Sequence, residues 1–254
     1  MREPSWFTES VWRATRARPR VNYDPRMKKL WTVAAAAVFV MTFLHAQPRA
    51  QKDDNEAKRV QDATTIFGEI MAAEDKAIPN AILSKASGIA IFPGTIKAGL
   101  LVGGLRGRGV LSARGTNGWS SPAFLTLTGG SFGLQIGGES ADIILVINND
   151  RGLQNLVSNQ FKVGTDAAIA AGPVGRDAQA STDIQLRAQI LSYSRARGLF
   201  AGVTINGSTI RQDQDANERF YGKRLTTRQI VFEGQGSAPE SVEGWRAALA
   251  KYTK

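Results

Sequence analysis

Hydrophobic and polar positions follow two different periodicities along this chain. Over residues 51–76, apolar side chains recur three and four positions apart, as Val60, Phe67 and Ile70 illustrate. This spacing places them on one face and predicts an amphipathic helix of about six turns that Pro79 ends. The apolar stripe predicts contact with a protein core, because the acidic residues beside it suit an anionic membrane surface poorly.

Over residues 88–148 the spacing of apolar residues shortens to the period of two that is typical of strands. Short apolar segments alternate with Gly, Ser and Asn: GIAIFP, AGLLVGG, GVLSAR, AFLTLT, FGLQIGG and DIILVIN. Phe132, Leu134 and Ile136 alternate with small or polar residues as in a half-buried strand, whereas 143–147 is apolar on both faces, as in a central strand. The segment predicts an antiparallel sheet or a partly closed barrel, which its many glycines allow to bend sharply.

The remaining sequence mixes helical and extended patterns. Residues 152–161 favour a helix, and 183–195 fit either a helix or a long strand. Asn206-Gly207 supplies the two positive-φ positions of a type I′ turn, so residues 199–210 are predicted to form a hairpin. Further helices are predicted at Asp215–Tyr221, Thr226–Phe232 and Pro239–Tyr252.

Residues 51–254 contain no linker, charge run or internal repeat. The simplest interpretation is therefore a single domain. Because strands dominate its first half and helices are frequent at both ends, we predict an α+β fold. In this fold, a curved antiparallel β-sheet or partly closed barrel is flanked by helices.

The N-terminal segment differs from this domain. Residues 1–26 are Arg-rich and aperiodic, and Met27 offers a second start, so the upstream part is predicted to be misassigned or disordered. The 15-residue apolar run Leu30–Leu44 precedes small residues at Ala46, which predicts a signal peptide at 27–46. The run is shorter than the ~20 residues that span a bilayer, although an uncleaved anchor is the alternative. We expect a periplasmic or secreted protein.

The formal net charge of +10 depends on this segment. Six arginines precede Met27, whereas from Gln51 onward 23 Lys and Arg face 19 Asp and Glu, a net charge of +4. So small an excess predicts no nucleic-acid partner. It is compatible with peripheral attraction to an anionic lipid surface, at about 1 kcal/mol for each basic side chain held close to it.

Missing residue types exclude most catalytic chemistry. The chain has no cysteine, so disulfides, thiolate nucleophiles, Cys-ligated zinc and a lipoprotein anchor are all excluded. Its one histidine, His45, lies in the segment that export would remove. Ser-His-Asp triads and HExxH zinc sites are then impossible, although Ser-Lys and paired-carboxylate chemistry stay formally open. We predict a protein that is not an enzyme and has no cofactor and no metal.

Two motif-like segments lack the residues that their chemistry needs. The glycine-rich stretch 103–109 has no Gly-Lys-Ser/Thr ending, so it is not a phosphate-binding loop. Asp213, Asp215 and Asn217 are spaced as in a calcium loop, but Glu218 stands where the turn glycine belongs. These acidic residues instead predict the capped start of a helix.

Four arginines are the candidate binding residues. Arg106 and Arg108 share one face of a predicted strand, and two adjacent guanidinium groups suit a phosphate or carboxylate. Arg195 and Arg197 stand near the end of a predicted helix. The structural alternatives are an edge strand protected by charge and a helix end that complements its dipole.

An ordered set of short motifs resembles the SYLF domain family over residues 57–252. The motifs are IAIFP at 89–93, GG at 103–104, GRGVL at 107–111, WSSP at 119–122, GLQIG at 133–137, Asp142, GPVGR at 172–176, YSRARGLFAG at 193–202 and YG at 221–222. The resemblance implies binding of phosphoinositides and acidic phospholipids in eukaryotic members, and of actin in a yeast-type subgroup. Bacterial members are typically exported, many as lipoproteins. The missing cysteine departs from that lipoprotein pattern.

Two hypotheses of function follow. The first is a non-catalytic envelope or secreted protein that binds anionic phospholipid, with phosphoinositide-like head groups, through Arg106, Arg108, Arg195 and Arg197. The second is a structural or protein-interaction domain of the envelope without lipid affinity. Actin binding is not carried over, because the signal segment is of bacterial type.

Overall fold

The computed structural model describes residues 54–73, 77–99, 102–132, 137–175, 187–196, 198–236 and 239–253. These residues belong to one folded unit, Ala50–Lys254. The predictions for residues 1–26 and 27–46 lie outside the described residues, as do Arg197, Leu134 and Ile136.

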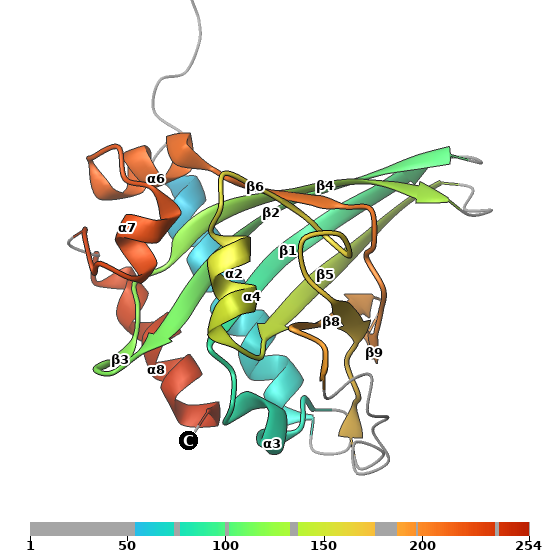
Figure 1. Cartoon of the computed structure of the whole chain (residues 1–254), viewed down its shortest axis with the longest axis horizontal. Coiled ribbons are helices and arrows are strands. Elements are labelled where there is room, and N and C mark those ends of the chain that lie inside the picture. Colours follow the sequence, from blue (N-terminus) through green and yellow to red (C-terminus); the bar gives the residue numbers. More distant parts are fainter. Residues whose placement is uncertain are drawn as a thin grey trace, which may run out of the picture. The chain divides into compact units, whose positions relative to one another are not determined.

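A curled sheet forms the centre of this unit (Figure 1). Its strand order is β6-β10-β4-β2-β1-β5-β8-β7, with β3 paired to β2 and β9 paired to β8. The long strands are β1 (Gly88–Gly99), β2 (Val102–Gly115), β4 (Ala123–Phe132) and β5 (Gly137–Ile147). The short strands are β3 (Gly118–Trp119), β6 (Gln160–Lys162), β7 (Ile169–Ala171), β8 (Ile190–Ala196), β9 (Leu199–Gly202) and β10 (Thr209–Gln212). Every described pairing between these strands is antiparallel except that of β7 with β8.

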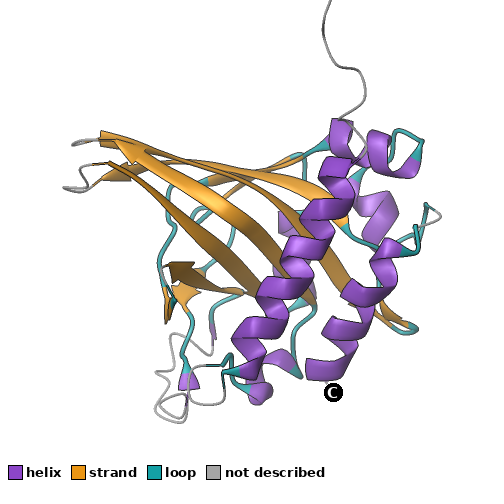
Figure 2. Cartoon of the chain, turned by 180° about the vertical axis from the view of Figure 1, so that it is seen from behind, coloured by secondary structure: helices purple, strands orange, loops and turns teal. Residues whose placement is uncertain are grey.

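Helices cover both faces of the sheet. Their bounds are α2 (Asp54–Ala72), α3 (Asn80–Leu83), α4 (Asp150–Leu156), α6 (Gln214–Tyr221), α7 (Thr227–Val231) and α8 (Ser241–Tyr252). Figure 2 shows α2 and α8 side by side across one face, which we call the helix face. The opposite face carries α4, whose Leu153 packs against Gly88 of β1. The predicted α+β fold, with a curved and partly closed sheet flanked by helices, is confirmed.

The apolar stripe of α2 faces the core, as its spacing predicts. Val60 and Phe67 are fully buried and Ile70 nearly so. The Phe67 ring meets the Trp245 ring of α8 edge-on at a centroid distance of 6.3 Å. Trp245 donates its indole N–H to the Ser112 hydroxyl of β2 at 2.8 Å, so the one polar atom of this buried ring is paired. These contacts fix both helices to β2.

Three of the sequence-based assignments are wrong in detail. No hairpin forms over residues 199–210, because β9 pairs with β8 and β10 pairs with β4 and β6, although Gly207 does turn with a φ of 79°. The helix predicted at 152–161 ends at Leu156 and gives way to β6. The segment AGLLVGG is not one strand, since its two ends belong to the paired strands β1 and β2. In each case tertiary pairing overrides a local signal.

Glycine is required where β2 crosses the β1 bulge. A Cβ on Gly109 would lie 2.5 Å from both the Ile91 carbonyl oxygen and the Phe92 ring. We predict that Gly109→Ala lowers the free energy of unfolding by about 1–3 kcal/mol through overpacking. Gly104→Ala on the same strand is the matched control, because no atom lies within 4 Å of its Cβ position. Urea denaturation of both variants tests this, and equal stabilities would contradict it.

Candidate functional site

Arg106 and Arg108 project from the helix face of β2, beyond the area that α2 and α8 cover. Exposed and buried residues alternate strictly from 104 to 109, and both arginines are exposed. Ser112, which Trp245 contacts, lies an even number of residues further along the same strand and therefore on the same face. The predicted common face of the two arginines is confirmed.

Neighbouring strands extend this pair into two rows across the sheet. Strand register gives one row as Arg106, Thr128, Thr209 and Lys162, and the other as Arg108, Thr126, Arg211 and Gln160. Directly paired residues point to the same side, so all eight side chains share the helix face. We call the four cations Arg106, Arg108, Lys162 and Arg211 the basic stripe.

The spacing of the basic stripe follows from sheet geometry. Arg108 and Arg211 flank Thr126 from two sides, so their backbones are about 10 Å apart, twice the spacing of neighbouring strands. The two rows are separated by two residues, about 7 Å. Four long cationic side chains therefore surround the shorter side chains of Thr126, Thr128 and Thr209.

The charges of the basic stripe are not neutralised. All four side chains are exposed. Within the described part of the chain, no carboxylate lies within ion-pair distance of them. Arg211 donates a hydrogen bond to the amide oxygen of Gln160 at 3.1 Å, which leaves its charge available. The surface thus offers uncompensated positive charge with adjacent neutral hydroxyl groups.

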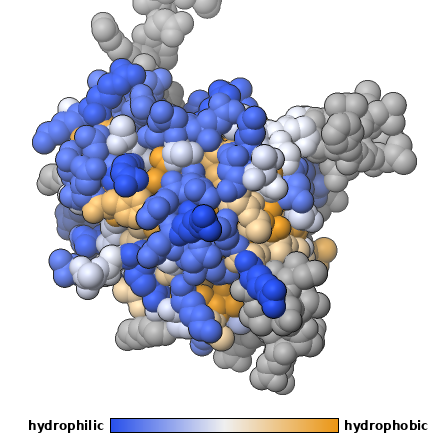
Figure 3. Space-filling view, viewed as in Figure 1, coloured by the Kyte–Doolittle hydropathy of each residue, from blue (hydrophilic) through white to orange (hydrophobic). Residues whose placement is uncertain are grey.

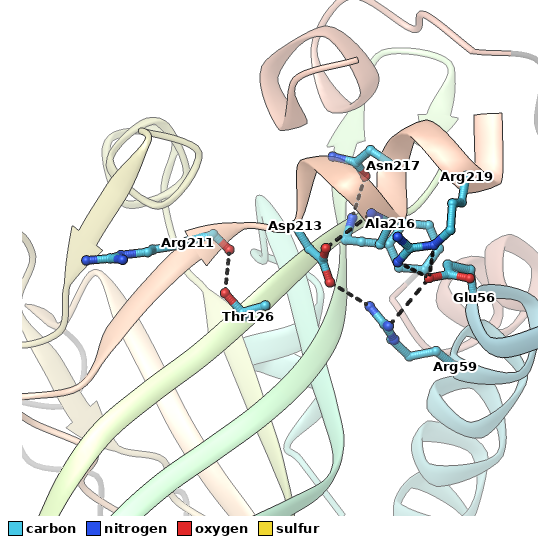
Figure 4. Close-up of polar contacts among 9 residues, drawn as sticks. Glu56, Arg59, Thr126, Arg211, Asp213, Ala216, Asn217 and Arg219 are labelled. Carbon is cyan, nitrogen blue, oxygen red and sulfur yellow. Dashed lines mark hydrogen bonds and ion pairs between the residues drawn. The ribbon is translucent and has the colours of Figure 1, made fainter. Parts of the chain in front are cut away.

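A buried ion cluster marks the edge of the helix layer (Figure 4). Glu56 in the first turn of α2 accepts hydrogen bonds of 3.1 and 2.7 Å from Arg219 of α6. Arg59, one turn further along, donates to Asp213 at 3.4 Å and lies over the Phe124 ring of β4. Beyond Phe124 the next residue on this face of β4 is Thr126, where the rows begin.

This cluster is strongly desolvated. Glu56 and Arg59 are only 1% and 5% exposed. Burial lowers the pKa of Arg59, and so does the nearby charge of Arg108, whereas Asp213 and Glu56 oppose the shift. The basic stripe begins beside the cluster, because Arg108 pairs with Thr126, two residues along β4 from the Phe124 ring that Arg59 covers. Asp213 also caps α6 by accepting from the Ala216 backbone N–H, which confirms the predicted helix start.

The chain is similar in sequence to one protein-family model and to several known proteins. The family model Ysc84, described as a Las17-binding protein actin regulator, matches residues 128–252. The human SH3 domain-containing YSC84-like protein 1 is 32% identical over 204 residues, covering 79% of this chain and 59% of that protein. Protein YSC84 of Saccharomyces cerevisiae is 31% identical over 201 residues, covering 77% of this chain and 42% of its own length.

The chain belongs to the Ysc84 (SYLF) domain family. It spans 59% or less of the length of these relatives. The family description is that of an actin regulator. The resemblance predicted from the ordered motifs is confirmed at the level of the family.

The SYLF domain places Arg195 in strand β8, so the prediction that it stands near the end of a helix is wrong, and its setting differs from that of the basic stripe. Arg195 of β8 pairs with Asp142 of β5 at 2.9 Å and with Glu69 of α2. Although burial alone would lower its pKa, the hydrogen bonds to Glu69 and Asp142 raise it overall. Three strand spacings, about 14 Å, separate β8 from β2. Arg195 therefore fastens α2 to the sheet, and the geometry does not join it to Arg106 and Arg108.

Two cations of the basic stripe were missed by sequence reasoning. Lys162 and Arg211 reach the site only because β10 inserts between β4 and β6. The alternation of Ile210 and Arg211 in a short strand is the one local signal that could have suggested an outward-facing arginine. Among the described residues, no group of three or more metal-ligating side chains is present, and no helix is long and apolar enough to cross a bilayer.

Removing one partner from the buried cluster should destabilise the SYLF domain. Glu56→Ala leaves Arg219 and Arg59 without this carboxylate, so we expect a loss of about 3–5 kcal/mol in unfolding free energy. The matched control on α2 is Lys58→Ala, which breaks an exposed pair with Asp62 and should cost less than about 0.5 kcal/mol. Chemical denaturation measures both variants, and a Glu56→Ala cost as small as that of the control would refute the role of the cluster.

Proposed function

We propose that this chain is a non-catalytic SYLF-domain protein that binds anionic phospholipid membranes peripherally, with phosphoinositide-like head groups, through the basic stripe. The observation that carries the proposal is a set of four exposed cations without carboxylate partners in the described structure. Guanidinium groups suit phosphate oxygens because their planar N–H groups can bind them in pairs.

Fixed charges are expected to supply most of the attraction to the membrane. In the described residues, the large apolar side chains that are exposed are Ile96 of β1, Leu199 of β9 and Phe232, which follows α7. Figure 3 looks onto the face that carries α4 and shows mainly hydrophilic residues with smaller apolar areas between them. Attraction by fixed charges is screened by salt, so binding should weaken as ionic strength rises.

Vesicle binding tests the proposal. We expect the full chain to co-sediment with vesicles of phosphatidylglycerol and phosphatidylcholine at low salt, and much less at high salt. The double variant Arg108→Gln/Arg211→Gln should bind about thirty-fold more weakly, because each basic side chain near the surface contributes about 1 kcal/mol.

A variant with the same change in charge provides the control. Arg151→Gln/Lys223→Gln removes two exposed cations outside the basic stripe, one in α4 and one after α6. All variants carry the same N-terminal segment. Its contribution to vesicle binding is therefore the same in each variant and does not affect the comparison between them. Equal weakening by both double variants would show that net charge, not the basic stripe, governs binding.

A protein-interaction role is the second candidate, because the family model names Las17 and actin in its description. In that case the domain would hold a protein partner and have no lipid affinity. Neutral and anionic vesicles would then give the same co-sedimentation, and Arg108→Gln/Arg211→Gln would leave it unchanged. This outcome would replace the membrane proposal.

We further propose that the protein is exported to the periplasm or exterior after cleavage near Ala46. The support is the sequence pattern of residues 27–46, with two lysines before an apolar run of signal-peptide length. Expression of the full chain in a bacterial host with Sec export should yield a periplasmic product. N-terminal sequencing of that product should begin at Gln47, whereas a product that begins at Met1 or Met27 would contradict the assignment.

A further inference from the structure

An exposed apolar side chain lies beside the basic stripe. Ile96 of β1 is 56% exposed, and strand register pairs it directly with Arg106 of β2. Directly paired residues point to the same side of a sheet, with their Cβ atoms about 5 Å apart. Ile96 is therefore on the helix face, in the same row as Arg106 and Thr128.

The contacts of the neighbouring strand agree with this placement. The partner of Ile96 on β5 is Ser140, and Asp142 lies two residues further along β5 and hence on the same side. Asp142 pairs with Arg195, which also binds Glu69 of α2. Because α2 lies on the helix face, the register and the side-chain contacts assign Ile96 to the same surface.

The described helices leave this part of the sheet uncovered. Figure 2 shows the long strands continuing past α2 and α8 toward the tip of the sheet. The next row in that direction includes Gly104 and Gly130, which are both exposed. No atom lies within 4 Å of the position that a Cβ would take on either glycine. Ile96 therefore projects from a region in which these two neighbours contribute no side chain.

The position of Ile96, more than its exposure, points to a ligand. Isolated apolar side chains are ordinary on the surface of soluble proteins. Leu199 is 69% exposed, but it pairs with Ala196, which follows Arg195 and points to the opposite side of the sheet. Ile96, in contrast, shares its face and its row with cations of the basic stripe.

The surroundings of Ile96 favour an anionic bilayer as the partner. Arg106 lies beside it, and the nearby acids Glu69 and Asp142 are both paired with Arg195. These two carboxylates therefore oppose the approach of anionic lipid only weakly. Basic side chains next to an exposed apolar one are typical of surfaces that lie at the boundary between lipid head groups and acyl chains.

We infer that Ile96 inserts into the boundary between head groups and acyl chains when the basic stripe binds an anionic bilayer. This inference rests on the proposed function, since it adds an apolar contact to the same membrane-binding surface. The cations attract the bilayer over a distance of about 10 Å in 0.1 M salt. Ile96 contributes only on contact, because its gain comes from removing apolar area from water.

The variant Ile96→Thr tests the inference, because threonine keeps the branched Cβ that suits a strand and loses apolar area. With vesicles of phosphatidylglycerol and phosphatidylcholine, the full chain carrying this change should bind about five-fold more weakly, as expected for losing the burial of about half an isoleucine side chain. This ratio should stay the same as salt rises, whereas the effect of Arg108→Gln/Arg211→Gln should shrink.

Leu199→Thr is the matched control, since it removes a more exposed apolar side chain from the opposite side of the sheet. This variant should bind the same vesicles as tightly as the unmodified chain. If both threonine variants weaken binding equally, or if neither does, Ile96 is not the apolar contact.

Quenching from within the bilayer measures insertion without depending on the stability of the threonine variants. A fluorophore on Ile96→Cys should be quenched by phosphatidylcholine that carries a nitroxide on its acyl chain, and a fluorophore on Leu199→Cys should not. Each label has a single site, because the chain has no cysteine of its own. Vesicle binding without quenching at position 96 would overturn the inference and leave the proposed membrane function standing. Failure to bind any anionic vesicle would instead contradict the proposed function, and the inference with it.

Discussion

Four charged side chains, Glu56, Arg59, Asp213 and Arg219, share a desolvated site where the first turns of α2 meet α6. Buried charges of this kind constrain their elements strongly, because loss of one partner leaves another charge out of water. The cluster therefore fixes the end of α2 above Phe124. Beyond that point the described helices do not cover the rows on β2, β4, β10 and β6, so their outward side chains meet solvent and are polar.

The candidate site could be predicted only in part. Arg106 and Arg108 were assigned to one face because alternation along a strand is a local property of the sequence. Arg211 and Lys162 join them through pairings between strands far apart in the chain. The hairpin predicted at 199–210 obscured this by placing β10 beside β9, although the turn at its centre does form.

In the fold as well, local features could be predicted from the sequence, whereas contacts between distant segments could not. The apolar stripe of α2 and the helices near the C-terminus were predicted because periodicity and capping residues act within a few positions. The partners of Arg195 were not, since Glu69 and Asp142 come from a helix and a strand that only tertiary packing brings together. An arginine that looks like a ligand group in the sequence can thus fasten elements together. A similar residue without carboxylate partners is the better candidate for binding.

The central claim is that the outer surface of β4 and β10, rather than the face that carries α4, meets the anionic ligand. Because the chain has no cysteine, single cysteines can carry an environment-sensitive fluorophore without further changes. Thr128→Cys places it within the basic stripe, and Gln154→Cys places it on the exposed side of α4. With phosphatidylglycerol vesicles, we predict a blue-shifted emission at position 128 and none at 154. A shift at 154 alone, or equal shifts at both positions, would contradict this account.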